Sequence, residues 1–436
     1  MKKKISISTT VTLVLLAMAL TVSLTMLLAM RYFNEQLLEV SNRQKTYSYI
    51  NDVDNIVREY YPVIDEPLLQ QGIAQGYIYG IDDPYAAYYT TEQYAEEKLH
   101  TAGKAKNVGI VLGEMKNVVT DTTDVVVSRV YTDSAADRVG VKAGDVVVVM
   151  NGESVAGKKL SELQVLADTA AEVSLTVRRG EGEASYTMKM DEYDVRSVQS
   201  MVLDNVGYVR ITAFYDNTPD QFETAIDFLM EQGVDGLVFD LRNNVGGSSQ
   251  AVQDMLSQVM PLGAYGTMTD TKGNVTNLST KVSKTLTLPS VTLINGVTAG
   301  EAEFFAGALQ EAGLTTVMGQ TSAGKAKYQQ YFVLEQNYSA LKLTVGEYGL
   351  IKGGSWEGKG ILPAQEVVLP PEQAGNQMLS PYEDAQVQAA VDHLEVDAPI
   401  VDPDPPVTDP TADPSVTDPS GTDTTGTGTT TTTATP

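Results

Sequence analysis

The longest apolar run lies near the N-terminus of the chain. A lysine cluster, Lys2–Lys4, precedes an almost uncharged stretch at about Val11–Met30. About 20 apolar residues in a helix span the hydrocarbon core of a bilayer, and flanking lysines mark the cytoplasmic side. The pattern predicts a cytoplasmic N-terminus (1–8), a transmembrane anchor (9–30) and an extracytoplasmic bulk, in a single-pass protein of the cell membrane. A cleaved signal peptide is the alternative, although no clear A-x-A site precedes Arg31.

Residues 31–100 have apolar positions at helical spacing. These positions recur at intervals of three and four residues in two stretches, which Pro62 and Pro67 separate. The run Gly80–Pro84 ends the second stretch. The pattern predicts a helical N-terminal region.

The pattern changes to strands at residues 101–192. Val125–Val127 and Val146–Val149 are β-branched runs, and Asn151 with Gly152 forms a tight-turn signal. Three leucines at positions 160, 163 and 166 place an apolar stripe on one short helix. This region is expected to be a small β-rich module.

Strand and helix patterns alternate at residues 200–394. Val206–Ile211, Leu237–Phe239 and Val291–Ile294 are expected strands, and helices are expected after Thr218 and up to about Leu309. A final helix is expected at Asp384–Leu394. The alternation predicts an α/β core.

The C-terminal residues 395–436 are rich in Asp, Pro and Thr and contain no Lys or Arg. Such a segment cannot bury enough surface to offset its ordering entropy, so a disordered tail is predicted. It is interpreted as a solvated spacer.

Charge and composition exclude several functions. The net charge of -26 argues against a nucleic-acid partner, since phosphate binding requires clustered Lys and Arg. The absence of cysteine excludes disulfides, thiolate metal ligands and cysteine nucleophiles. No H-E-x-x-H motif is present, and we expect no metal and no cofactor. His100 lies before the β-rich region and His393 lies beside the C-terminal tail, so neither is expected in the α/β core and a Ser-His-Asp triad is not expected. A catalytic base would then be a Lys or a carboxylate.

Two glycine-rich turns follow expected strands. Asp240–Ser248 contains Gly246 and Gly247, whose backbone N–H groups could face an anion. Asn295–Glu303 joins a strand to a helix, and the N-terminus of a helix can stabilise an oxyanion. A lysine follows at Lys325, which could act as a base if burial lowers its pKa. Taken alone, each feature is also compatible with a structural turn or a solvated lysine.

Four motifs occur in one order along the chain. Gly80–Tyr88 is similar to G-x-x-D-P-Y-S-x-Y, with Ala86 in place of Ser. Gly144, Asp145, Asn151 and Gly152 follow a G-D…N-G pattern. Asp240–Gly247 is similar to D-L-R-x-N-x-G-G, and Gly360–Pro363 to G-I-x-P. Together, from about Tyr47 to Leu394, the chain resembles the carboxyl-terminal processing peptidases, the tail-specific Ser-Lys proteases of family S41, with a PDZ domain. The resemblance implies a ClpP/crotonase-like α/β peptidase core.

The resemblance also implies a peptide-binding groove. In the family, loop N–H groups of the PDZ module hold a substrate's C-terminal carboxylate, and the last residues add as a strand. The matching loop here is Asn107, Val108, Gly109 and Ile110. The short leucine-rich helix would form a wall of this groove. A PDZ-like fold that serves only as a spacer or gate is the alternative.

The match to the family's catalytic motif fails at the position of the nucleophile. The family reads S/T-A-S-x-x-E at the elbow, where the second Ser is the nucleophile, and this chain has Gly300 at that position. The resemblance assigns Lys325 as the base, Gln329 as its support, and Gly246 or Gly247 with Glu301 as oxyanion donors. Family members usually have a small residue at position 301. A carboxylate there would repel an oxyanion, and pairing with Lys325 would keep that lysine protonated. The alternative is an acid favoured by the N-terminal dipole of the helix, without a catalytic consequence.

Several interpretations follow from this break. Gly cannot form an acyl-enzyme, so we expect a pseudo-protease that binds polypeptide C-termini or unfolded exported proteins. The Gly could also be an engineered replacement. An active serine-type endopeptidase would need a displaced hydroxyl, from Thr298 or Ser322. A non-catalytic envelope scaffold is the remaining class. Self-association is left open, as some relatives form dimers or rings.

Overall fold

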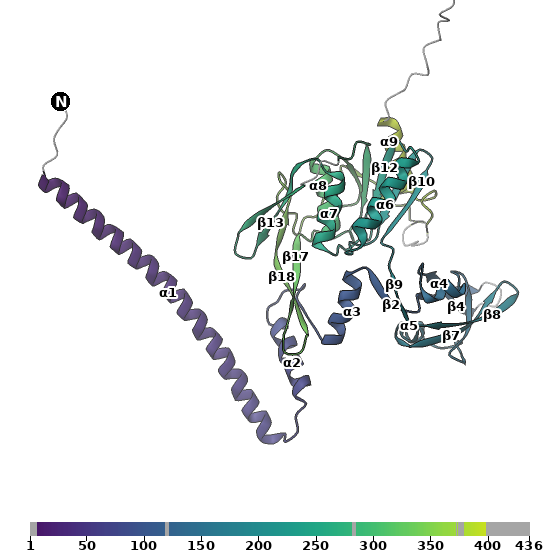
Figure 1. Ribbon diagram of the computed structural model, residues 1–436, viewed down its shortest axis with the longest axis horizontal. Coiled ribbons are helices and arrows are strands. Elements are labelled where there is room, and N and C mark those ends of the chain that lie inside the picture. The colour runs from purple at the N-terminus through teal and green to yellow at the C-terminus, as the bar shows by residue number, and fades with distance from the viewer. Residues whose placement is uncertain (1–6, 118–121, 281–284, 372, 374–378, 398–436) are drawn as a thin grey trace, which may run out of the picture.

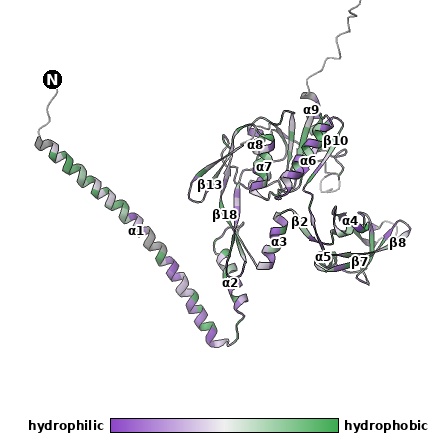
Figure 2. Cartoon of the chain, in the orientation of Figure 1, coloured by the Kyte–Doolittle hydropathy of each residue, from purple (hydrophilic) through white to green (hydrophobic). Residues whose placement is uncertain are grey.

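The computed structural model describes residues 7–117, 122–280, 285–371, 373 and 379–397. It begins with α1 (Ile7–Tyr60), a single helix of 54 residues that extends away from the folded body (Figure 1). Its segment Thr10–Asn34 has a mean hydropathy of 2.4 and no buried residue, and Figure 2 shows this part in green. The chain therefore has an N-terminal helix that is long and apolar enough to cross a membrane. The predicted cytoplasmic residues 1–6 lie outside the described residues.

Two shorter helices follow α1. Asp65 caps α2 (Glu66–Tyr79) by accepting a hydrogen bond from the Leu68 N–H at 3.0 Å, and Pro67 lies in the first turn. Thr90 begins α3 (Thr91–Thr101) with a capping box. No residue of α2 is buried, although the sequence gives it an apolar face.

The β-rich module is a separate antiparallel sheet with its own core. The sheet order is β3-β4-β5-β7-β8, and β6 pairs with β5. Its core contains Leu163, Ala167, Val127, Val147 and Leu175, all of them buried. The elements of the module are β3 (Ile110–Asn117), β4 (Thr122–Val130), α4 (Ala135–Val139), β5 (Val146–Met150), β6 (Glu153–Ser154), α5 (Leu160–Thr169), β7 (Glu172–Arg179) and β8 (Gly182–Lys189).

A two-stranded ribbon connects this module to the rest of the chain. The ribbon pairs β2 (Lys104–Asn107) with β9 (Asp191–Asp194). Within the module, Asp145 is 1% exposed and accepts two hydrogen bonds of 2.6 Å from the Arg179 guanidinium. Burial alone would raise the pKa of Asp145, but the hydrogen bonds from Arg179 hold it below its usual value. This pair ties the loop before β5 to the end of β7.

The core sheet has six strands in the order β10-β11-β12-β15-β16-β19. Its first pair is antiparallel and the remaining pairs are parallel. β12 and β15 are buried along their whole length, as expected for parallel strands covered on both faces. The strands are β10 (Val198–Leu203), β11 (Val206–Ile211), β12 (Gly236–Asp240), β15 (Ser290–Ile294), β16 (Thr316–Gly319) and β19 (Gln365–Glu366).

Helices cover both faces of this sheet. Phe239 packs with α6 (Thr218–Glu231), α7 (Ser249–Val259) and α8 (Glu301–Glu311) in the larger cluster of buried residues. Its neighbour Val238 points to the opposite face, into a second cluster with α9 (Ala385–Asp397). The α/β prediction is confirmed. α9 continues to Asp397, past the expected end at Leu394, and residues 398–436 of the predicted tail lie outside the described residues.

A second antiparallel sheet lies beside the core. Its order is β1-β18-β13-β14, and β17 also pairs with β18. The hairpin of β17 and β18 extends toward α2 (Figure 1). The strands are β1 (Ala87–Tyr89), β13 (Gly263–Asp270), β14 (Val275–Thr280), β17 (Lys327–Val333) and β18 (Ala340–Gly349).

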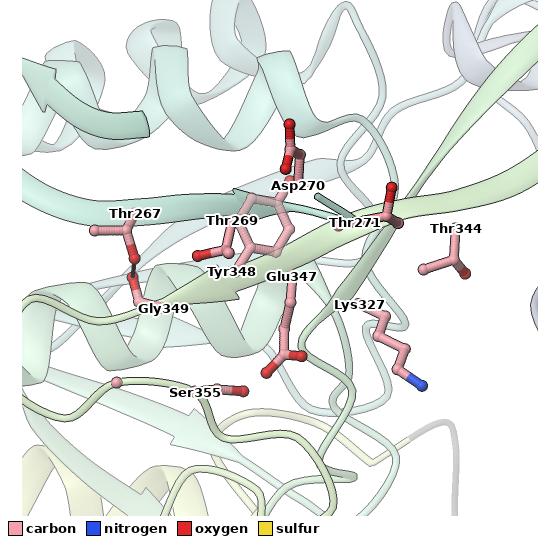
Figure 3. A pocket seen from close by; sticks show the side chains of 12 residues that line it. Thr267, Thr269, Asp270, Thr271, Lys327, Thr344, Glu347, Tyr348, Gly349 and Ser355 are labelled. Atoms are coloured by element: carbon pink, nitrogen blue, oxygen red, sulfur yellow. Dashed lines mark hydrogen bonds between the residues drawn. The ribbon is translucent and has the colours of Figure 1, made fainter. Parts of the chain in front are cut away.

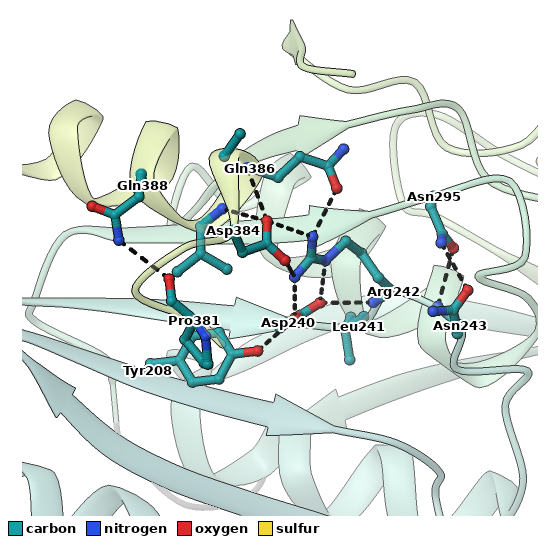
Figure 4. Close-up of polar contacts among 12 residues, drawn as sticks. Tyr208, Asp240, Leu241, Arg242, Asn243, Asn295, Pro381, Asp384, Gln386 and Gln388 are labelled. Carbon is teal, nitrogen blue, oxygen red and sulfur yellow. Dashed lines mark hydrogen bonds and ion pairs between the residues drawn. The ribbon is translucent and has the colours of Figure 1, made fainter. Parts of the chain in front are cut away.

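A buried ionic cluster joins the end of β12 to α9 (Figure 4). Asp240 accepts hydrogen bonds from the Arg242 side chain at 2.8 and 2.7 Å and from the Tyr208 hydroxyl at 2.6 Å. Arg242 also pairs with Asp384 at 2.9 Å. Burial alone would raise the pKa of Asp240, and Arg242 keeps it below its usual value. The cluster fixes the start of the glycine-rich turn that follows β12.

Candidate functional site

The elbow between β15 and α8 has an unusual backbone conformation. Gly300 is the N-cap of α8, with φ 63° and ψ -124°. Only glycine adopts a positive φ of this kind without strain. A Cβ at Gly300 would nevertheless meet only ordinary contacts, 3.5 Å from the Val245 carbonyl oxygen and 3.7 Å from the Gly246 Cα. The space for a side chain is present, but the chain places no side chain there.

A fully buried carboxylate joins this elbow to the loop of Lys325. Glu303 Oε2 accepts hydrogen bonds from the backbone N–H groups of Gly300 at 3.0 Å and Lys325 at 2.8 Å. Its Oε1 accepts from the Gly324 N–H at 2.7 Å and the Ser322 hydroxyl at 2.5 Å. The elbow at Gly300 and the loop that contains Lys325 are therefore both hydrogen-bonded to the Glu303 side chain.

Burial perturbs the Lys325 side chain. Burial lowers its pKa, while the negative charge of Glu301 acts in the opposite direction and Lys342 adds to the lowering. The net direction is downward: Glu301 favours the protonated amine, as expected, but the effect of burial on the pKa of Lys325 is larger. The amine also lies 4.7 Å from the centre of the Tyr85 ring, in the Gly80–Tyr88 motif. A lowered pKa is what a lysine base needs, and the assignment of Lys325 as the base stays a prediction.

Gln329 lies on β17, within the second sheet. Its amide nitrogen donates to the Lys327 carbonyl at 3.2 Å and to the Thr344 hydroxyl at 3.4 Å. Within the described part of the chain, neither of these hydrogen bonds connects Gln329 to Lys325. Its assignment as a support for the base stays a prediction.

The turn after β12 meets the elbow through Glu301. Gly246 donates its N–H to Asn244 Oδ1 at 2.9 Å, inside the turn. Gly247 instead donates its N–H to Glu301 Oε2, also at 2.9 Å. A Cβ on Gly246 would lie only 2.4 Å from that carboxylate oxygen and 3.1 Å from the Glu301 nitrogen. The N–H groups of Gly246 and Gly247 thus both have acceptors within the protein, and the acceptor for Gly247 is the Glu301 carboxylate.

Tyr348 lies on the other side of the Glu301 carboxylate. Its hydroxyl donates to Glu301 Oε1 at 3.2 Å and also contacts the Ser249 hydroxyl. Its ring stacks on Phe304 at 4.8 Å, and burial raises its pKa well above the usual value. Tyr348 also lines a pocket of about 410 Å³ between β13 and β18, shown in Figure 3 with Thr269, Glu347 and Lys327. Tyr348 is therefore a residue that the lining of this pocket shares with the candidate site.

The two hydroxyls considered as replacement nucleophiles are engaged elsewhere. Thr298 is fully buried, and its hydroxyl donates to the Leu241 carbonyl at 2.9 Å. The Ser322 hydroxyl donates to Glu303 and accepts from the Ile361 N–H at 2.6 Å. Both side chains hold loops in place.

The histidines take part in other contacts. His100 Nε2 lies 3.3 Å from the Tyr215 hydroxyl. His393 lies on α9, with its Nε2 3.3 Å from the Thr316 hydroxyl on β16. The sequence placed His393 beside the tail, whereas α9 packs it against the core sheet. Within the described residues there is no group of three or more His, Cys, Asp or Glu that could hold a metal ion.

The predicted carboxylate loop lies between β2 and β3. The Asn107 side chain accepts hydrogen bonds from the Gly109 N–H at 2.8 Å and the Tyr193 hydroxyl at 2.9 Å. The Val108 carbonyl accepts from the Ala136 N–H at 2.9 Å. Val108, Gly109 and Ile110 are all buried. The Gly109 N–H therefore already has an acceptor, which belongs to the loop itself.

Sequence reasoning did not assign roles to Glu303, Tyr85 or Tyr348. Glu303 is the third residue of α8, where an acid commonly closes a capping box, and this signal was available in the sequence. Tyr85 belongs to a recognised motif, but its contact with Lys325 is a tertiary one. No local pattern indicates the contact of Tyr348 with Glu301.

Comparison with known proteins gives two family matches. Residues 205–367 match Peptidase family S41, and residues 126–179 match the PDZ domain. The carboxy-terminal processing protease CtpA of Bacillus subtilis is 29% identical over 323 residues, which cover 73% of this chain and 68% of CtpA. The carboxyl-terminal-processing protease of a Picosynechococcus species is 28% identical, over 73% of this chain and 78% of its own. A solved structure described as an S41 protease, from Bacteroides fragilis, aligns with a TM-score of 0.52 at 17% identity, over 73% of this chain and 87% of its own, which shows a common fold.

Proposed function

We propose that the chain, which matches peptidase family S41 over residues 205–367 and the PDZ domain over residues 126–179, binds the C-terminal ends of polypeptides with peptide-bond turnover lost or strongly reduced. The observation that carries this proposal is Gly300 at the elbow, with the Glu301 carboxylate hydrogen-bonded to the Gly247 N–H. Serine-type hydrolysis requires a nucleophile and a site for the oxyanion. Gly300 bears on the first requirement, and the Glu301 carboxylate bears on the second.

The first requirement is a nucleophile. Attack on a peptide carbonyl forms a covalent acyl-enzyme, and the residue at the elbow must supply the attacking oxygen. Gly300 has no side-chain oxygen, and the Thr298 and Ser322 hydroxyls are bonded elsewhere. The elbow keeps the sharp backbone conformation in which nucleophiles are typically presented.

The second requirement is a place for the oxyanion. Hydrolysis concentrates negative charge on the carbonyl oxygen, and preorganised N–H donors normally stabilise that charge. Here the Gly247 N–H already donates to a carboxylate. An oxyanion formed at this position would have to displace Glu301 and would meet its negative charge.

The lysine supports a relationship to active enzymes. Burial lowers the pKa of Lys325, as a general base would need, and Glu303 holds the Lys325 loop at the elbow. Gln329 is proposed to support this lysine from β17. The arrangement is that of a peptidase site with the base in place and without a nucleophile.

The PDZ domain supports the choice of ligand. Such modules take the carboxylate of a polypeptide end on loop N–H groups, proposed here for Asn107, Val108, Gly109 and Ile110, and add its last residues to a sheet edge. The relatives are described as carboxy-terminal processing proteases, consistent with recognition of polypeptide ends. The proposed partners are the C-termini of exported or unfolded polypeptides.

The proposed location is the outer side of the cell membrane. The apolar segment Thr10–Asn34 continues without a break into the polar half of α1 (Figure 2), which supports a retained anchor with cytoplasmic lysines. The proposed boundaries are the anchor (9–30), the helical region (31–100), the PDZ-like module (101–192) and the peptidase core (200–394). Mass determination of the mature N-terminus in a membrane fraction tests this, because signal cleavage would remove the apolar segment.

The test of function uses the full chain in detergent with an unfolded protein and a panel of free-ended peptides. The wild type is compared with Gly300→Ser and with Gly300→Ser/Glu301→Ala. The double variant is needed because Gly300→Ser restores a hydroxyl but leaves the Glu301 carboxylate bonded to the Gly247 N–H. We expect no cleavage by the wild type, weak cleavage by the single variant and faster cleavage by the double variant. Adding Lys325→Ala to the double variant should abolish cleavage.

Two controls make the result interpretable. Gly300→Ala places a Cβ at the elbow without a hydroxyl and should stay inactive. Binding of the peptide panel is measured in parallel by fluorescence anisotropy, and the wild type should bind. Cleavage by the wild type at a rate comparable to the double variant would show that a residue other than position 300 supplies the nucleophile.

A further inference from the structure

The sheet of the PDZ-like module has two edge strands, β3 and β8, and β3 is the edge where a ligand strand is proposed to add. β3 is the terminal strand of the sheet and pairs with β4 on one side only. Its other side faces α5, which packs beside it. Edge strands expose backbone N–H and C=O groups that a further strand can pair with.

The Gln164 side chain, on α5, already occupies two of these backbone groups. Its Oε1 accepts a hydrogen bond from the Leu112 N–H at 2.8 Å. Its Nε2 donates to the Ile110 carbonyl at 3.1 Å. One side-chain amide therefore makes the donor and acceptor contacts that the backbone amides of an added peptide would make to the same edge.

A second side chain holds Gln164 in this position. Asp168, one helical turn further along α5, accepts a hydrogen bond from Gln164 Nε2 at 3.0 Å. The Asn107 amide lies 3.5 Å from the same carboxylate oxygen and uses its own oxygen to accept from the Gly109 N–H. Backbone groups of the β3 edge and of the adjoining loop thus have hydrogen-bond partners in one connected set of side chains, Asn107, Gln164 and Asp168.

We infer that Gln164 is a gate of the peptide groove, which an incoming extended peptide end must displace from β3 before it can pair with Ile110 and Leu112. This inference rests on the proposed binding function and adds a residue that sets its affinity. Displacement replaces two side-chain hydrogen bonds by two backbone hydrogen bonds of similar kind, so the gate lowers affinity without blocking binding. Asp168 keeps the gate closed through its hydrogen bond to the Gln164 amide.

The test measures binding of a fluorescein-labelled, alanine-rich hexapeptide with a free carboxylate to the full chain in detergent, by anisotropy. Gln164→Ala should bind about tenfold more tightly than the wild type, because the peptide no longer competes with the side-chain amide. Ser161→Ala, an exposed change on the same helix, is the matched control and should leave the affinity unchanged.

Hydrogen exchange of the Leu112 amide gives a second, independent readout. In the wild type this N–H is bonded to Gln164, so its exchange should accelerate in Gln164→Ala and slow again when the peptide is added. If Gln164 only stabilises the module, Gln164→Ala should bind the peptide more weakly than the wild type. If Gln164 has no role in binding, the affinity of Gln164→Ala should be unchanged. Either result, with binding by the wild type intact, overturns the gate alone. Absence of binding in every variant overturns the proposed function together with the gate.

Discussion

The backbone N–H of Gly247 donates a 2.9 Å hydrogen bond to the carboxylate of Glu301, a residue 54 positions later in the chain. In a serine-type peptidase, a donor at this place would face the charge that develops on the substrate carbonyl. Here a negative charge of the protein itself is held by that donor and by the Tyr348 hydroxyl. The Glu301 carboxylate therefore occupies a donor that an oxyanion would need, and the proposed loss of turnover involves two adjacent residues, Gly300 and Glu301.

The conformation of Gly300 predicts a stability cost for any side chain at the elbow. Gly300→Ser and Gly300→Ala should each lower the free energy of unfolding by about 1–3 kcal/mol, because a non-glycine residue is strained at φ 63°. Urea unfolding of the full chain in detergent measures this cost. The two variants should agree with each other, because the Cβ itself meets only ordinary contacts. An unchanged unfolding midpoint would indicate that the elbow relaxes to accept the side chain.

The pKa of Lys325 predicts selective chemical labelling. Because burial lowers this pKa from the ordinary 10.5, Lys325 should become reactive toward a small amine-acylating reagent at a lower pH than the exposed Lys272. Peptide mapping by mass spectrometry follows both residues across a pH series. Glu301→Ala should move the Lys325 transition to still lower pH, since the Glu301 charge favours the protonated amine. Equal labelling of both lysines at every pH would contradict the burial of this amine.

The lowered pKa of Lys325 also makes the free energy of unfolding depend on pH. A lysine with a lowered native pKa binds fewer protons in the folded state than in the unfolded state between the native value and 10.5. The contribution of Lys325 to folding should therefore become more favourable as pH rises through that window. Lys325→Met should remove this contribution, which is seen as a difference in the pH slope of the unfolding free energy between wild type and variant.

Replacing Glu303 is expected to lower the stability of the fold and also to disrupt the geometry of the candidate site. Its carboxylate accepts four hydrogen bonds, and a glutamine amide offers only one accepting oxygen. Glu303→Gln should lower the free energy of unfolding by about 3 kcal/mol. It should also abolish any activity of Gly300→Ser/Glu301→Ala, since the Lys325 loop loses its attachment to the elbow. Glu231→Gln, an exposed change at the end of α6, is the control and should affect neither quantity.

The Asp240–Arg242–Asp384 cluster predicts a large difference between buried and exposed ion pairs. Arg242→Met leaves two buried carboxylates without their partner and should lower the free energy of unfolding by about 3–5 kcal/mol. Arg196→Met removes an exposed pair with Asp133 and should change it by less than about 1 kcal/mol. Hydrogen exchange in α9 should accelerate only in the Arg242 variant. Comparable effects of the two changes would contradict the role assigned to the cluster.

The sequence by itself determined the elements with strong local signals. The apolar run near the N-terminus gave the long helix, and short apolar runs gave the buried strands β12 and β15. Pro62, Pro67 and the run Gly80–Pro84 placed the ends of α2 approximately. The motif order gave the resemblance to peptidase family S41, and Gly300 at the expected nucleophile position gave the prediction that turnover is lost or reduced. These features depend on neighbouring residues, so a single sequence contains them.

Only the tertiary structure decided what the candidate site contains. Glu301 could have pointed toward Lys325 or into solvent, and its position at Gly247 depends on where a turn 54 residues away lies. Tyr85 reaches Lys325 across most of the chain, and Gln164 reaches β3 from a helix 52 residues further on. The direction of the Lys325 pKa shift follows from burial, which no spacing of residues specifies. Such contacts arise from the packing of distant segments, and local sequence patterns describe the segments without their partners.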